Sequence, residues 1–148
     1  QGVSTGYPQL FVPVRSLAEV QGMDALALDV PALTTLCSEL GLPGPDVAVF
    51  SLETVNPDRD VHLRFFAPHQ GIPEDPATGS ASGGLGSYLI RHGLIAATAP
   101  VTTIHTEQGL EMHRPSHVIV DVEGAPDTIR MVRVSGDVVP MLDGRFSW

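Results

Sequence analysis

The chain has 148 residues, 43% of them hydrophobic and 17% charged, and its formal net charge is −9. This length and composition predict one folded domain over residues 1–148 and exclude a disordered acidic tail. The negative charge argues against nucleic acid as a partner, because phosphate backbones are bound by basic surfaces. Its apolar runs are shorter than the ~20 residues of a membrane-spanning helix, so we expect a protein in solution and not in a membrane.

The rare residue types narrow the chemistry further. One cysteine, Cys37, forms no internal disulfide, and we expect the protein in the reducing cytoplasm. All eight basic residues are arginines, so no lysine is present to form a Schiff base with pyridoxal phosphate or a substrate. The six histidines lack the spacing of a helical metal site, so we expect no metal.

The elements predicted before residue 70 alternate between strands and helices. A capping box at Ser16 and Glu19 predicts a short helix around residues 17–21. Apolar residues three and four apart predict a helix over residues 31–40 that buries Cys37. Strands are predicted over residues 9–15, 47–52 and 61–66.

The second half of the chain predicts one helix, residues 79–91, and then only strands. These strands are predicted over residues 101–107, 117–122, 129–135 and 138–142. Apolar residues alternate along residues 117–122, as in a sheet with one buried face. Together these elements predict an α+β domain of about seven mostly antiparallel strands and two sizeable helices.

The predicted helix of residues 79–91 contains four glycines. Each glycine costs a helix up to ~1 kcal/mol, and a surface helix would recover nothing in return. Close packing can compensate for this loss of helix stability, because a helix with few large side chains can approach its neighbours closely. We therefore expect this helix to run through the middle of a curled sheet and to present its N-terminus at the mouth.

The segment before this helix, "EDPATGS" from Glu74 to Ser80, is a candidate site. The free N–H groups of a helix N-terminus favour a bound carboxylate, which the hydroxyls of Thr78 and Ser80 can reinforce. Gly79 lets a ligand approach the backbone closely. Asp75 and Glu74, one on either side of such an anion, can move a proton on the carbon next to it. The same residues also match an ordinary helix start, and the pattern alone leaves both interpretations open.

Three segments resemble one protein family. They read "VSTGYPQLFVPVRS" at residues 3–16, "RFFAPHQGIPEDPATGSASGGLGSYL" at residues 64–89 and "EQGLEMHRPS" at residues 107–116. In this order they resemble the PhzF-like proteins of phenazine biosynthesis, which have the diaminopimelate-epimerase-like fold. The resemblance implies a cofactor-independent isomerase or epimerase in which each of two domains curls a sheet around a central helix. Its active site lies between the domains.

The chain resembles only the second, C-terminal domain of this family. The resemblance implies that Asp75 is an acid/base residue and that Ser80, with the Gly79 amide beside it, contacts the substrate carboxylate. The family's principal proton-transfer glutamate belongs to the first domain, and Glu74 is not that residue. The chain departs from the family at His113, where a smaller residue is usual, which affects the packing of that loop.

Three functional hypotheses follow. We favour the C-terminal half of a PhzF-like isomerase that acts on a small carboxylic acid, is inactive alone and needs a missing N-terminal domain. The start at Gln1 favours this hypothesis. The second hypothesis is a self-sufficient homodimer, in which two copies imitate the two domains and share a cleft. The third is a binding or structural module that kept the fold without the chemistry. We expect a dimer.

Overall fold

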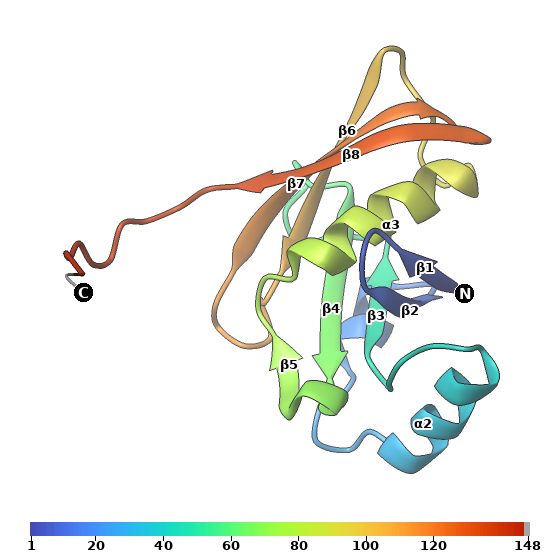
Figure 1. The fold of residues 1–148 in the computed structure, drawn as a ribbon, viewed down its shortest axis with the longest axis vertical. Helices are drawn as coiled ribbons and strands as arrows, with labels where there is room; N and C mark the ends of the chain where they lie inside the picture. Colours follow the sequence, from blue (N-terminus) through green and yellow to red (C-terminus); the bar gives the residue numbers. More distant parts are fainter. Residues whose placement is uncertain (147–148) are drawn as a thin grey trace.

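Eight strands form one sheet in the part of the chain that the computed structural model describes, residues 1–146 (Figure 1). The strands are β1 (Gly2–Ser4), β2 (Pro8–Pro13), β3 (Val47–Ser51), β4 (Val61–Ala67), β5 (Ile72–Asp75), β6 (Val101–Gln108), β7 (Ser116–Ala125) and β8 (Thr128–Gly136). Their order is β1-β2-β3-β4-β6-β7-β8, with β5 paired to β4. The β2–β3 and β4–β6 pairs are parallel and the others antiparallel, which confirms the mostly antiparallel α+β prediction.

Helices complete the fold. They are α1 (Leu17–Gln21), α2 (Val30–Glu39) and α3 (Gly79–Arg91), and a 3₁₀ turn, η1, spans Pro68–Gln70. The predicted capping box starts α1, because the Ser16 side chain accepts from the Glu19 amide and the Glu19 side chain accepts from the Ser16 amide. Cys37 on α2 is buried, as expected. None of the described helices is long and apolar enough to cross a membrane.

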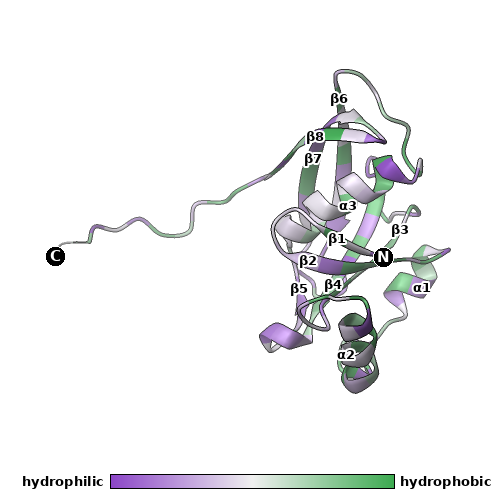
Figure 2. Cartoon of the chain, turned by 45° about the vertical axis from the view of Figure 1, so that its right-hand side comes forward, coloured by the Kyte–Doolittle hydropathy of each residue, from purple (hydrophilic) through white to green (hydrophobic). Residues whose placement is uncertain are grey.

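Helix α3 lies inside the curl of the sheet, between the β1–β2 hairpin and strands β7 and β8 (Figure 1). It is pale over much of its length in Figure 2, because small residues of intermediate hydropathy make up its body. A Cβ at Gly84 would lie 2.7 Å from the Phe11 ring, and a Cβ at Gly86 would lie 2.6 Å from Val120 Cγ1. The glycines therefore permit the close packing that the sequence predicts, and the central helix is confirmed.

The two faces of the sheet have different surroundings. The face toward α3 forms the larger apolar core, in which Leu63 and Phe65 of β4 meet Leu85 and Leu89 of α3. The opposite face forms a smaller apolar cluster around Phe66. It also carries a set of buried charged residues. Which face a side chain occupies therefore decides whether it can reach the N-terminus of α3.

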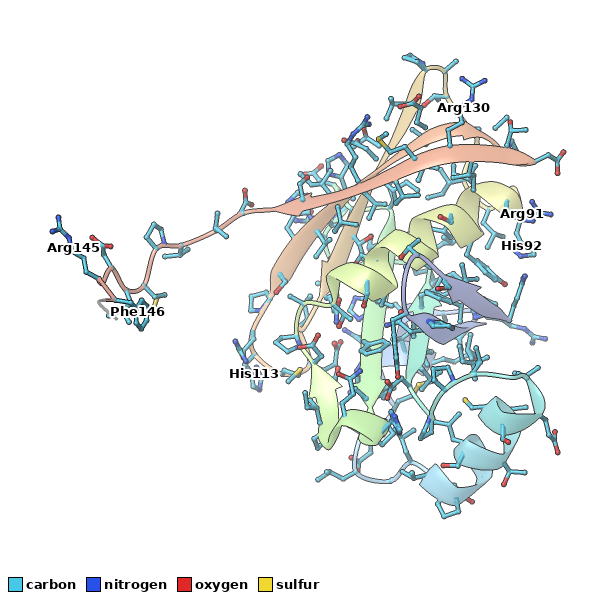
Figure 3. All side chains as sticks on the ribbon, viewed as in Figure 1. Arg91, His92, His113, Arg130, Arg145 and Phe146 are labelled. Carbon is cyan, nitrogen blue, oxygen red and sulfur yellow. The ribbon has the colours of Figure 1, made fainter. Side chains whose placement is uncertain are left out.

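The predicted strand at residues 138–142 is wrong. Residues 137–146 are extended but pair with no described strand, and they lead away from the sheet beyond β8 (Figures 1 and 2). Figure 3 places Arg145 and Phe146 far from the sheet. The side chains of Val138 and Leu142 are 90% and 96% exposed. An apolar run becomes a strand only where another strand satisfies its hydrogen bonds, and among the described residues this run has none.

Candidate active site

The register of β5 separates the two adjacent carboxylates of the candidate site. Asp75 is paired with Phe65 of β4 and shares its face of the sheet, on the side of α3. Successive side chains of a strand point to opposite faces, so Glu74 lies on the other side with Arg64. Glu74 and Asp75 therefore cannot flank one bound anion, and that interpretation of the sequence is wrong.

Glu74 is instead one partner of a buried ion pair. Arg64 donates from Nε to Glu74 Oε1 at 2.8 Å and from Nη2 to Glu74 Oε2 at 2.7 Å. Both side chains are nearly buried, at 4% and 7% exposure. Arg64 Nη1 also donates to the carbonyls of Val20 and Met23, which fixes the C-terminal end of α1 against the sheet. The role of Glu74 in this site is therefore structural.

The four predicted site residues do come together. A pocket of about 280 Å³ opens at the N-terminus of α3, and Asp75, Thr78, Gly79 and Ser80 all line it. The other residues of its lining are Gln9, Phe65, Ala67, Gln70, Ile72 and Ala77. The pocket thus combines one carboxylate, two hydroxyls and the start of a helix, which is the predicted set of groups without Glu74.

The first turn of α3 is not capped by its own side chain. Thr78 is the N-cap residue, but its hydroxyl makes no hydrogen bond to the helix amides. The hydroxyl donates instead to Asp75 Oδ2, at 2.5 Å. Ser80 Oγ accepts from Gln9 Nε2 at 3.1 Å, so the proton of the Ser80 hydroxyl remains available for a ligand. Helix amides and dipole favour an anion at this position.

Sequence reasoning missed Gln108, the last residue of β6. Its side chain is fully buried, and Oε1 accepts from the Thr78 amide at 3.0 Å. Nε2 donates to the Asp75 carbonyl at 2.7 Å and to Thr78 Oγ1 at 3.1 Å. The available signal was the segment "EQGLEMHRPS", which carried the family resemblance but no assigned role for Gln108.

Gly109 allows this contact between β6 and the site. Its φ is +78°, a conformation that other residues rarely adopt. A Cβ at this position would collide with the carbonyl oxygens of Arg114 and Pro76. The end of β6 therefore lies directly against the backbone of the turn that carries Asp75. In the same loop, His113 has a left-handed backbone, with φ +55°. Glycine adopts this conformation more easily than histidine. This is the position at which the chain departs from the family resemblance.

A second group of charges lies on the outer face of the sheet. His62 of β4 is fully buried; its Nδ1 is 2.7 Å from Glu107 Oε1 and its Nε2 is 3.2 Å from Glu111 Oε1. Burial lowers the pKa of His62, but its contacts with Glu111 and Glu107 outweigh burial and raise that pKa. For Glu111, burial acts to raise the pKa, but its contacts, led by the hydrogen bond with His62, outweigh burial, so the pKa of Glu111 is lowered. Glu107 additionally accepts from the Val55 and Asn56 amides.

Comparison with known proteins gives the family. The model of the family described as phenazine biosynthesis-like protein matches residues 1–144. The chain belongs to this family. It is 28% identical over 139 residues to the uncharacterized isomerase YddE of Escherichia coli K12. The matched segment covers 94% of this chain and 44% of that protein. The trans-2,3-dihydro-3-hydroxyanthranilate isomerase of Pseudomonas fluorescens is 43% identical over 76 residues, or 51% of this chain and 26% of that protein.

A solved structure supports the same fold. The Bacillus anthracis phenazine biosynthesis protein of the PhzF family superposes with a TM-score of 0.67 at 24% identity. The match covers 89% of this chain and 46% of that protein. The chain thus spans about half the length of the phenazine biosynthesis-like relatives that it matches. Family and fold confirm the resemblance found in the sequence.

Proposed function

We propose that this chain is one half of a PhzF-like isomerase or epimerase that moves a proton on a small carboxylic acid. The observation that carries the proposal is the common pocket of Asp75 and the α3 N-terminus. A substrate carboxylate bound at the first-turn amides and the Ser80 hydroxyl brings its neighbouring carbon toward Asp75. The isomerase names of the relatives support the same reaction class.

Asp75 serves as one acid/base group in the proposed reaction. One C–H bond breaks as its proton passes to a base, and another forms with a proton from an acid, without net oxidation. The name of the Pseudomonas fluorescens relative specifies a carboxylate substrate, which supports a small carboxylic acid here. We extend the proposal to the cytoplasm, since a single free, buried cysteine suits a reducing compartment.

The pocket at the N-terminus of α3 holds no second acid/base side chain among the described residues. Glu74 is paired with Arg64, and the carboxylates of Glu107 and Glu111 contact His62 on the outer face of the sheet. Asp75 is therefore the one carboxylate that lines the pocket within residues 1–146. This supports an active site completed by another domain, or by a second copy of the chain.

The extended tail, residues 137–146, also favours another domain. It exposes five large apolar side chains along a short segment, Val138, Val139, Met141, Leu142 and Phe146. The base of this tail lines a further cavity together with Ala77 and Gly79, so it leaves the fold next to the site. A body that covered the base of the tail would stand beside the pocket, where the second half of the site is needed.

The test is proton exchange with solvent. The complete protein is incubated with small carboxylic acids in deuterated water, and deuterium on the substrate carbon is followed by NMR. We expect exchange in the wild type and its loss in Asp75→Asn, with Asp58→Asn as control because Asp58 is an exposed carboxylate outside the pocket. Exchange that persists in Asp75→Asn contradicts the role of Asp75.

Two further outcomes separate the alternatives. Absence of exchange with every acid tried would favour a binding module of the same fold. Exchange by a chain of this length alone, with a dimeric mass in solution, would favour the self-sufficient homodimer. The expected result is exchange only when a partner domain is present.

A further inference from the structure

The geometry points to Gln108 as a positioning residue for Asp75, acting through the Thr78 hydroxyl. This inference rests on the proposed function, because it concerns the carboxylate that moves the proton. We infer that Gln108 orients the Thr78 hydroxyl, which holds Oδ2 of Asp75 by a hydrogen bond. The other carboxylate oxygen, Oδ1, is left for the substrate. Gln108 itself is buried and does not line the pocket.

The orientation of the Gln108 amide is determined by its backbone partners. The atom that faces the Thr78 amide must be the oxygen, because a backbone N–H can only donate. The atom that faces the Asp75 carbonyl must be the nitrogen, because a carbonyl can only accept. A flipped amide would place two donors together and two acceptors together. The second N–H of Gln108 is therefore available for Thr78 Oγ1.

The direction of the Thr78 proton follows from this orientation. Thr78 Oγ1 accepts from Gln108 Nε2, so its own single proton is free to point elsewhere. It donates to Asp75 Oδ2, which as a carboxylate oxygen can only accept. The three groups thus form one chain of hydrogen bonds, from the Gln108 amide through the Thr78 hydroxyl to the Asp75 carboxylate.

This chain distinguishes the two oxygens of Asp75. Oδ2 is occupied by Thr78, whereas no donor among the described residues makes a hydrogen bond to Oδ1. Thr78 is only 8% exposed and Gln108 is fully buried, so water competes little for these bonds. A carboxylate held by one oxygen keeps a fixed orientation toward the substrate, and such positioning affects the rate more than it affects binding.

The test compares two substitutions of Thr78 in the complete protein. Thr78→Val keeps the shape and removes the hydroxyl, whereas Thr78→Ser keeps the hydroxyl. We expect Thr78→Val to lower kcat of deuterium exchange by about 10- to 100-fold with KM within about threefold, and Thr78→Ser to restore most of that loss. An unchanged kcat in Thr78→Val, or an equal loss in Thr78→Ser, overturns the proposal.

Gln108 is tested against Thr78 in a double-mutant comparison. Gln108→Leu removes the amide at similar size, and its folding is checked by circular dichroism. If Gln108 acts through Thr78, the loss of kcat in the double variant equals that of Thr78→Val alone, because Gln108 has nothing left to orient once the hydroxyl is gone. Independent, multiplying losses overturn the proposal. If Gln108→Leu does not fold, the kcat values of Thr78→Val and Thr78→Ser still test the proposal.

A third readout needs no activity. A hydroxyl proton held between Thr78 and Asp75 exchanges slowly with water and gives an NMR signal of its own. We expect this signal in the wild type and its loss in Gln108→Leu. A signal that is absent from the wild type, or unchanged in Gln108→Leu, overturns the positioning role. Failure of the proposed function alone removes proton exchange in the wild type and leaves this signal in place.

Discussion

Replacing Gly86 by alanine tests whether close packing explains the glycines of α3. The new methyl carbon would lie 2.6 Å from Val120 Cγ1 and 3.2 Å from Val122 Cγ2. Carbon atoms in contact sit ~3.5–4.0 Å apart, so Val120 would have to move by roughly 1 Å. Both valines are fully buried in β7, in the middle of the core. Overpacking of this kind costs ~1–3 kcal/mol.

Helix propensity opposes this loss and has to be separated from it. Alanine gains up to ~1 kcal/mol over glycine in a helix interior. Gly83→Ala on the same helix serves as the control, since its Cβ would lie 3.2 Å from Val134 Cγ2 and Val134 is 42% exposed and can yield. Both variants gain the same propensity, so their difference reports the overlap at Gly86. We expect Gly86→Ala to be less stable than Gly83→Ala by about 1–3 kcal/mol.

Urea unfolding of the two variants, followed by circular dichroism, measures this difference. Their slopes against urea should be alike, because neither substitution changes the surface that unfolding exposes. Equal midpoints for Gly86→Ala and Gly83→Ala would refute the packing argument. The four glycines would then need another explanation.

Three further predictions concern the site and its support. Gly109→Ala should lower stability by more than ~1–2 kcal/mol, the cost of a left-handed backbone, because its Cβ also collides with Pro76, and urea unfolding measures this. Gln9→Leu should raise KM more than it lowers kcat, because Gln9 holds Ser80, and steady-state kinetics of the complete protein separates the two. The pKa of His62 is raised in the folded protein above its unfolded value of ~6.5. Its positive charge therefore stabilises the fold fully below pH ~6.5, and this stabilisation is lost as the pH rises through the folded-state pKa. The free energy of unfolding should therefore decline above pH ~6.5 in the wild type and not in His62→Gln, as urea melts across pH will show.

Each of these predictions has a contrary result. A Gly109→Ala variant as stable as the wild type would mean that the turn can move away from β6. An unchanged KM in Gln9→Leu would mean that the substrate does not depend on the hydrogen bond from Gln9 to Ser80. The same decline of stability with pH in His62→Gln and wild type would assign that decline to other groups.

The sequence by itself determined the local features of this protein. Spacing within one helical turn placed Thr78, Gly79 and Ser80 at the start of α3, and four glycines required that α3 be buried. These conclusions held because helix starts and helix packing depend on residues close together in the chain. The same local order assigned Asp75 to the site, since it lies three residues before the N-cap Thr78.

Only the tertiary structure decided the remaining features. Glu74 and Asp75 are adjacent in the chain, yet the register of β5 on β4 sends one to Arg64 and the other to the pocket. Gln108 reaches Thr78 from 30 residues away through the end of β6. An apolar run at residues 138–142 predicted a strand, but a strand needs a neighbouring strand to pair with, and this run has none among the described residues. Strand register and strand partners are set by hydrogen bonds between distant segments, which no local spacing encodes.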